Sequence, residues 1–279
     1  MALQGIGFRQ RLPVPATLVA VAMSPLVIAQ MRRIAGNASE VREARDGNSA
    51  STELIRVADA CLIVKVPGER ETVEMSDLVR LRRLHPHVSA VAIYVPNESS
   101  YKGALQLGAA GITEIVSSQP IFDERDFLAA LSRCHADGVA VRIWKLTNPV
   151  LPELLIPLLK AALRLAHGPV STTRLASAAG MHERTLRKYC EHAQLPSPQW
   201  IIGWARLLIA AFYLEEPGRT IGNVAELLEY PSASALRNQI RRYTGASPSA
   251  IRAHSMMTSL CRLLETTFRE HERSVSLAP

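Results

Sequence analysis

Residues Pro198–Glu216 show an unbroken helical pattern, in which apolar side chains recur every three or four positions. Pro198 suits the first turn of this helix, and the run Glu215–Gly218 ends it. At 1.5 Å per residue, a helix of about 18 residues is roughly 27 Å long. A rigid helix of this length can hold the segments on either side of it at a defined distance from each other.

A short helix-turn-helix pattern lies on each side of this helix. In the first, Leu175–Tyr189, Gly180 occupies the turn, where a backbone free to take positive φ is needed. In the second, Thr220–Arg252, the helical spacing breaks at Pro231 and a new helix opens at Ser232. We therefore predict an all-α domain with two helix-turn-helix units joined by a long helix.

These elements resemble the DNA-binding domain of AraC-type (AraC/XylS) transcriptional regulators, a family with seven helices, two helix-turn-helix units and a long joining helix. The family's motif is matched at Ser197, Pro198, Arg206, Leu207, Ala210, Tyr230, Gly245, Ser247, Pro248 and Arg252. Three positions depart from it: Glu229 replaces a usual glycine, and Leu236 and Ile201 replace usual aromatic residues. We expect these departures to change the packing more than the fold.

The resemblance and the outward-facing polar positions together indicate which side chains contact DNA. Candidate base contacts are Arg184, Arg187 and Lys188 in the first unit and Ala233, Ser234, Arg237 and Asn238 in the second. Arginine forks match guanine, asparagine matches adenine, and an alanine methyl group can meet the thymine methyl group. Candidate phosphate contacts are Ser171, Thr220, Arg241 and Arg242.

Simpler explanations stay open for some of these residues. Ser171 and Thr220 are equally well explained as helix caps, and Ser232 is expected to cap the second recognition helix. The basic face of the first recognition helix can also be a solvated charged surface, closed by Glu183 and Glu191.

The basic residues are unevenly spread along the chain. Its formal net charge is +7, and residues 151–279 hold 15 Lys and Arg against 10 Asp and Glu, with no aspartate. Such an excess in the half that holds the helix-turn-helix units is expected for contact with phosphates, although a generally basic surface has the same composition.

From Thr17 onward, short apolar runs alternate with helical segments. The predicted strands are Thr17–Met23, Glu40–Arg45, Cys61–Val66, Ala90–Val95 and Ile112–Val116. Strands of nearly continuous hydrophobicity separated by helices predict a doubly wound α/β domain: a five-stranded parallel sheet of flavodoxin-like order, covered on both faces. After a helix at Asp123–Ala136, residues Val139–Val150 predict one more strand.

This order of elements, the segment Leu107–Gly111 and the pair Gln119-Pro120 resemble a response-regulator receiver domain. That family has two acids where Met23-Ser24-Pro25 stands, an aspartate at Lys65-Val66-Pro67, a Ser or Thr at Val95-Pro96 and a lysine at Gln119. Because neither a Mg²⁺ site nor an acyl-phosphate acceptor remains, we predict a degenerate receiver-like domain that cannot take phosphate by the usual route. A still-active receiver would need another acid, such as Glu69 or Asp77.

These patterns divide the chain into a tail (1–15), the receiver-like domain (16–147), the double helix-turn-helix domain (148–253) and a C-terminal helix with its tail (254–279). Leu151–His167 is predicted to be the first helix of the DNA-binding domain. The C-terminal helix, Ser255–Glu272, has an apolar face, and one interpretation is that this face packs on the N-terminal domain or on a second subunit.

No cofactor, metal site or membrane span is predicted. The four cysteines have no C-x-x-C spacing, and Cys61 and Cys190 are expected to be buried thiols in a reducing cytoplasm. The most apolar segment, Ala16–Ala29, is broken at Ser24-Pro25, which favours a core strand over a signal peptide. We therefore expect a cytoplasmic protein.

The leading hypothesis is a bacterial-type, sequence-specific DNA-binding transcription regulator that reads a bipartite site in successive major grooves. Double-stranded DNA is its expected partner, and a homodimer and RNA polymerase are further candidates, with the receiver-like domain used for dimerisation or for sensing an unknown effector. The alternative is a protein–protein adaptor with weak or general DNA binding. An enzyme is not favoured, because no carboxylate pair, nucleophile elbow or phosphate loop stands at the strand ends.

Overall fold

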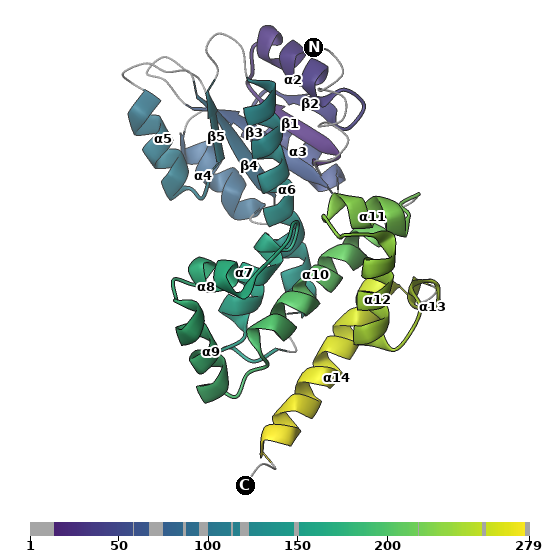
Figure 1. Cartoon of the computed structure of the whole chain (residues 1–279). Helices are drawn as coiled ribbons and strands as arrows, with labels where there is room; N and C mark the ends of the chain where they lie inside the picture. Colours follow the sequence, from purple (N-terminus) through teal and green to yellow (C-terminus); the bar gives the residue numbers. More distant parts are fainter. Residues whose placement is uncertain are drawn as a thin grey trace. The chain divides into compact units, whose positions relative to one another are not determined.

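A computed structural model describes residues 14–57, 59–66, 75–85, 88–94, 100–112, 114–117, 123–147, 151–216, 218–252 and 255–276 of the protein. The chain divides into two compact units, Met1–Gly138 and Val139–Pro279, called the first and second units below. A sheet with flanking helices makes up the first unit, and the described residues of the second are helices and their connections (Figure 1). The predicted fold class is confirmed.

The first unit contains a five-stranded parallel sheet. Its strands are β1 Thr17–Val21, β2 Glu40–Ala44, β3 Ala60–Lys65, β4 Ser89–Tyr94 and β5 Glu114–Ser117, in the order β2-β1-β3-β4-β5. Each of the five predicted strands is present, with ends shifted by a few residues. The three central strands are apolar almost throughout because helices cover both faces of the sheet.

Alternate residues of the central strands belong to two separate cores. The flanking helices are α2 Pro25–Ala35, α3 Gly47–Arg56, α4 Met75–Leu84, α5 Ser100–Ala109 and α6 Glu124–Thr147. Leu18 and Ile63 pack with α2 and the first half of α6, whereas Val19 and Leu62 pack with α3, α4 and α5. This alternation follows from the two-residue period of a strand.

The strand predicted at Val139–Val150 is wrong. Residues 139–147 continue α6, while residues 148–150 lie outside the described residues. Val139, Ala140 and Ile143 are buried at helical spacing in the core of the second unit. Gly138 stands inside the helix because a Cβ atom there would come within 2.8 Å of the Ser89 hydroxyl, which donates a hydrogen bond to the Cys134 carbonyl. A close approach to β4, and not a helix end, therefore explains this glycine.

The second unit is built around one central helix. Its helices are α7 Ile156–Leu165, α8 Thr172–Ala178, α9 Glu183–His192, α10 Pro198–Leu214, α11 Ile221–Leu227, α12 Ala233–Thr244, α13 Pro248–Arg252 and α14 Met256–Ser276. Fourteen of the 17 residues of α10 are buried, as a helix that is apolar on all sides requires. The long joining helix is thus confirmed, with Pro198 in its first turn and Ser197 as its N-cap. No helix within the described ranges is long and apolar enough to cross a membrane.

Helix α14 packs on α10 within the second unit. Its buried residues Leu260, Leu264 and Phe268 belong to the core of that unit. At its start, a carboxylate oxygen of Glu215 accepts hydrogen bonds from the Met257 amide at 2.8 Å and the Ser255 hydroxyl at 2.9 Å. The apolar face of this helix is therefore covered by its own unit. This differs from the interpretation that it packs on the N-terminal domain or on a second subunit.

Candidate nucleic-acid interface

The first helix-turn-helix consists of α8, a tight turn and α9. The Ser171 hydroxyl caps α8 by accepting a hydrogen bond from the Arg174 amide at 3.2 Å. Gly180 has a φ of 68°, which confirms the left-handed turn predicted there. Nδ1 of His182 then caps α9, and Leu186 is fully buried against the core. This geometry leaves the opposite side of α9 exposed.

The three predicted base-contacting residues of α9 lie on that side. Arg184, Arg187 and Lys188 are all exposed. Nη2 of Arg187 donates a hydrogen bond to Glu183 at 2.7 Å, and the Thr173 hydroxyl donates another to the same carboxylate at 2.6 Å. The bond from Thr173, and then that from Arg187, lower the pKa of the Glu183 carboxyl. The Arg187 side chain thus forms an i,i+4 ion pair on the exposed side of α9.

The second helix-turn-helix consists of α11 and α12, and both helices have side-chain caps. Thr220 and Asn223 form a capping box, in which the Thr220 hydroxyl accepts from the Asn223 amide at 3.1 Å. The Ser232 hydroxyl accepts from the Ala235 amide at 3.1 Å, so its predicted role as a cap is confirmed. Asn223 was not predicted as part of this cap, although a T-x-x-N run at a helix start is a recognisable signal.

One side of α12 carries the remaining polar candidates. Ser234, Arg237, Asn238, Arg241 and Arg242 are exposed, whereas Leu236 and Ile240 are buried on the opposite side. Ala233 differs from the others: it is half-buried and packs against the core, which weakens its case as a contact to a thymine methyl group. The exposed stripe repeats every three or four residues and so forms one continuous surface of the helix.

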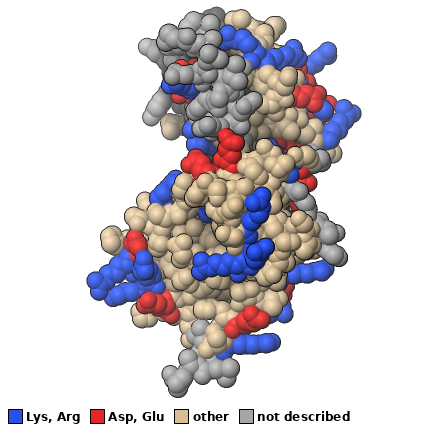
Figure 2. Space-filling view, turned by 45° about the vertical axis from the view of Figure 1, so that its right-hand side comes forward, with Lys and Arg blue, Asp and Glu red and all other residues tan. Residues whose placement is uncertain are grey.

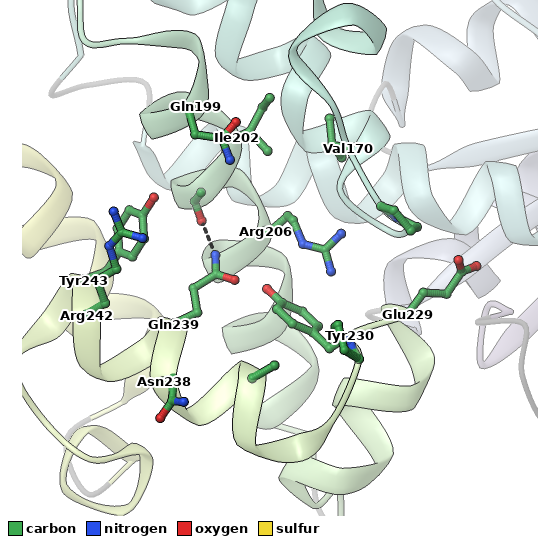
Figure 3. A pocket seen from close by; sticks show the side chains of 14 residues that line it. Val170, Gln199, Ile202, Arg206, Glu229, Tyr230, Asn238, Gln239, Arg242 and Tyr243 are labelled. Atoms are coloured by element: carbon green, nitrogen blue, oxygen red, sulfur yellow. Dashed lines mark hydrogen bonds between the residues drawn. The ribbon is translucent and has the colours of Figure 1, made fainter.

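A cavity of about 580 Å³ lies between α10, residues 169–170, the turn at residues 229–231 and α12. Figure 3 shows Gln239 directed across it, where its Nε2 donates a hydrogen bond to the Gly203 carbonyl at 2.9 Å. A Cβ atom on Gly203 would clash with the phenol of Tyr243, whose ring packs edge-on against Trp204. Gly203 was missed, although a glycine inside an apolar helix is a signal for a close approach.

Lys and Arg side chains lie at several places on the surface of the second unit, in the lower part of Figure 2. Within the described part of this unit, the phosphate candidates Arg241 and Arg242 are exposed, and Ser171 and Thr220 stand exposed at helix starts. All four thus occupy accessible positions, although the two hydroxyls already cap helices.

In the first unit, the sheet order places the carboxyl ends of β1 and β3 next to each other. Ser24 follows β1 and caps α2, and Lys65 is the last residue of β3. Neither position carries the carboxylate that a phosphate-accepting receiver needs. Pro67, Glu69, Val95, Pro96, Gln119 and Pro120 lie outside the described residues. The residues that are described contain no cluster of His, Cys, Asp or Glu suited to a metal ion.

Residues 175–254 match a family model, HTH_18, described as "Helix-turn-helix domain". This match confirms the AraC-type helix-turn-helix domain in the second unit. No curated protein sequence matches the chain significantly.

Several solved structures are similar to part of the chain. A signal receiver domain of an HD domain-containing protein from Pseudomonas fluorescens Pf-5 is 16% identical, with a TM-score of 0.39, over 47% of this chain and 93% of that one. A LuxR-family two-component response regulator from Aurantimonas sp. SI85-9A1 is 17% identical, with a TM-score of 0.37, over 44% and 86%. The chemotaxis response regulator CheY4 of Vibrio cholerae is 20% identical, with a TM-score of 0.35, over 43% and 98%.

Proposed function

We propose that the protein is a sequence-specific transcription regulator that reads a bipartite DNA site in successive major grooves. The observation that carries this proposal is α10, on which both helix-turn-helix units pack. A 17-residue helix is about 26 Å long at 1.5 Å per residue, which suits recognition helices one DNA turn apart. The exposed faces of α9 and α12 supply the base-reading side chains, and Arg241 and Arg242 hold phosphates.

The first unit serves dimerisation or sensing and does not accept phosphate. Two residues support the proposal that this unit does not accept phosphate. Ser24 and Lys65 occupy two positions that a phosphate-accepting receiver fills with acids. Regulation of transcription from a cytoplasmic location, with RNA polymerase as a further partner, follows from the DNA-binding role.

The decisive experiment is selection of bound sequences from a random DNA pool, using the full chain and the variants Arg187→Ala and Arg237→Ala. Two short half-sites about one helical turn apart are expected, and each variant should lose the sequence preference in one of them. Arg33→Ala, an exposed arginine of α2, is the matched control and should leave the motif unchanged.

Two other outcomes would change the assignment. Steeply salt-dependent binding without a motif would indicate a general DNA binder. Absence of binding would favour a protein–protein adaptor.

A further inference from the structure

Arg206 is a buried cation in the middle of α10. Its Nη1 donates a hydrogen bond to the carbonyl of Gly168, and its Nη2 donates one to the carbonyl of Leu228 at 2.9 Å. The guanidinium carbon lies 4.2 Å from the centre of the Tyr230 ring, and Figure 3 shows these two side chains next to each other. One side chain therefore contacts two chain segments that are far apart in the sequence, one at Gly168 and one at Leu228–Tyr230.

The Gly168 carbonyl lies in the connection that leads into the first helix-turn-helix, whereas the Leu228 carbonyl lies within the second. Gly168 follows α7 and precedes the Ser171 cap of α8, whereas Leu228 is the C-cap of α11. The Leu228 carbonyl stands at the C-terminus of α11, where the helix dipole is negative and a cation is stabilised. A planar guanidinium can satisfy both acceptors at once, whereas a lysine ammonium is a single point charge on a flexible stem.

The ring of Tyr230 is a further contact that holds the Arg206 guanidinium in place. Burial raises the pKa of its phenol, so the ring stays neutral beneath the guanidinium. The face of a neutral aromatic ring attracts a cation most strongly when both are shielded from water. Tyr230 follows Glu229 in the turn before α12, so this contact fixes the turn that leads into the second recognition helix.

A neighbouring contact supports the same junction from α12. Gly203 lies one helical turn before Arg206 on α10, and its carbonyl accepts the hydrogen bond from Gln239. The missing side chain at Gly203 also leaves the space that the phenol of Tyr243 occupies. The connection that leads into α8, the end of α11 and the helix α12 therefore all contact one short stretch of α10.

We propose that Arg206 is a positioning residue that sets the distance and angle between the two helix-turn-helix units, and so selects the spacing of the two DNA half-sites. This inference rests on the proposed bipartite function and adds the residue that determines its geometry. Arg206 itself is 9% exposed and contacts protein groups, so it acts through the units it joins.

The test uses the full chain and duplexes in which the two selected half-sites stand at their preferred spacing or one or two base pairs nearer or farther. Wild-type affinity should fall about tenfold or more when the spacing changes, a loss comparable to a mismatched base pair. Arg206→Lys should reduce this preference to about threefold or less while leaving affinity for a single half-site within about twofold. Tyr230→Phe retains the ring and should keep the wild-type spacing preference, whereas Tyr230→Leu should weaken it.

Arg174→Lys is the matched control, because Nη1 of Arg174 donates to the Pro169 carbonyl, five residues away in the segment that leads into the same helix. The inference is wrong if Arg206→Lys keeps the wild-type spacing profile, or if it weakens single half-sites as much as paired ones. Should Arg206→Lys fail to fold by circular dichroism, Tyr230→Leu decides by the same criterion. If the wild-type protein binds one half-site equally well with or without the other, the proposed bipartite function is itself wrong. The wild-type titrations alone give this result, so it is distinguished from a failure of the Arg206 proposal.

Discussion

At the scale of single residues, the two helix-turn-helix units differ in how they make the same turn. Gly180 has a φ of 68°, and Glu229, at the corresponding place in the second helix-turn-helix, has a φ of 53°. A side chain in this left-handed region costs roughly 1–2 kcal/mol, a cost that glycine avoids. The departure from the family's glycine therefore keeps the geometry of the turn and lowers its stability.

We expect Glu229→Gly to raise the free energy of unfolding by about 0.5–1 kcal/mol. The backbone strain that glycine relieves is worth more than the conformational entropy that glycine adds to the unfolded chain. The melting temperature should rise by roughly 1–3 °C. Gly180→Ala is the matched opposite: nothing lies within 4 Å of an added Cβ atom, so strain alone should lower stability by about 1 kcal/mol. Urea denaturation measures both. A less stable Glu229→Gly variant would show that the glutamate side chain contributes more than the backbone strain costs.

At the scale of elements, helix caps and phosphate contacts can be separated by experiment. Thr220→Ala removes one side of the capping box and should lower stability by about 1 kcal/mol. If Thr220 acts only as a cap, the slope of log K against log salt should stay unchanged. Arg241→Ala should leave stability within about 0.5 kcal/mol and reduce that slope by about 1. A reduced slope in Thr220→Ala would instead assign it a phosphate contact.

Helix α14 provides a second prediction at this scale. Leu264 is fully buried in the core of the second unit, so Leu264→Ala should lower its stability by about 2–5 kcal/mol through lost burial and a residual cavity. Arg269→Ala, an exposed change on the same helix, should stay within about 0.5 kcal/mol. Thermal unfolding of the full chain compares the two. Equal stabilities would mean that α14 is dispensable for the packing of α10.

At the scale of the whole molecule, the first unit combines the strand order β2-β1-β3-β4-β5 with Ser24 and Lys65 at two positions where a phosphate-accepting receiver carries acids. We expect no phosphoryl mass gain after brief treatment with acetyl phosphate, and no change in affinity for the selected DNA site. Intact-mass spectrometry and a binding titration check the two outcomes. A single added phosphoryl group would indicate another acceptor, and Asp77, which lies 3.6 Å from Arg80 on α4, is the first to substitute.

The sequence determined the features that depend on neighbours along the chain. Helical and strand periods, the caps at Ser171, Thr220 and Ser232, and the turn at Gly180 follow from a few adjacent residues, and the structure confirms them. The exposed faces of α9 and α12 could likewise be predicted, because burial of one helix side leaves the other accessible. Which of those side chains contact DNA remains a prediction.

Only the tertiary structure decided the features that join distant segments. The run after Gly138 alternates like a strand, yet packing against the second core and the approach to Ser89 make it helix. Arg206 meets carbonyls 38 and 22 residues away, a pairing that no local pattern encodes. The packing of α14 on α10 could not be predicted either, because an apolar face shows that a helix is buried but not which surface buries it. Periodicity describes one element at a time, whereas these contacts exist only once the elements have packed together.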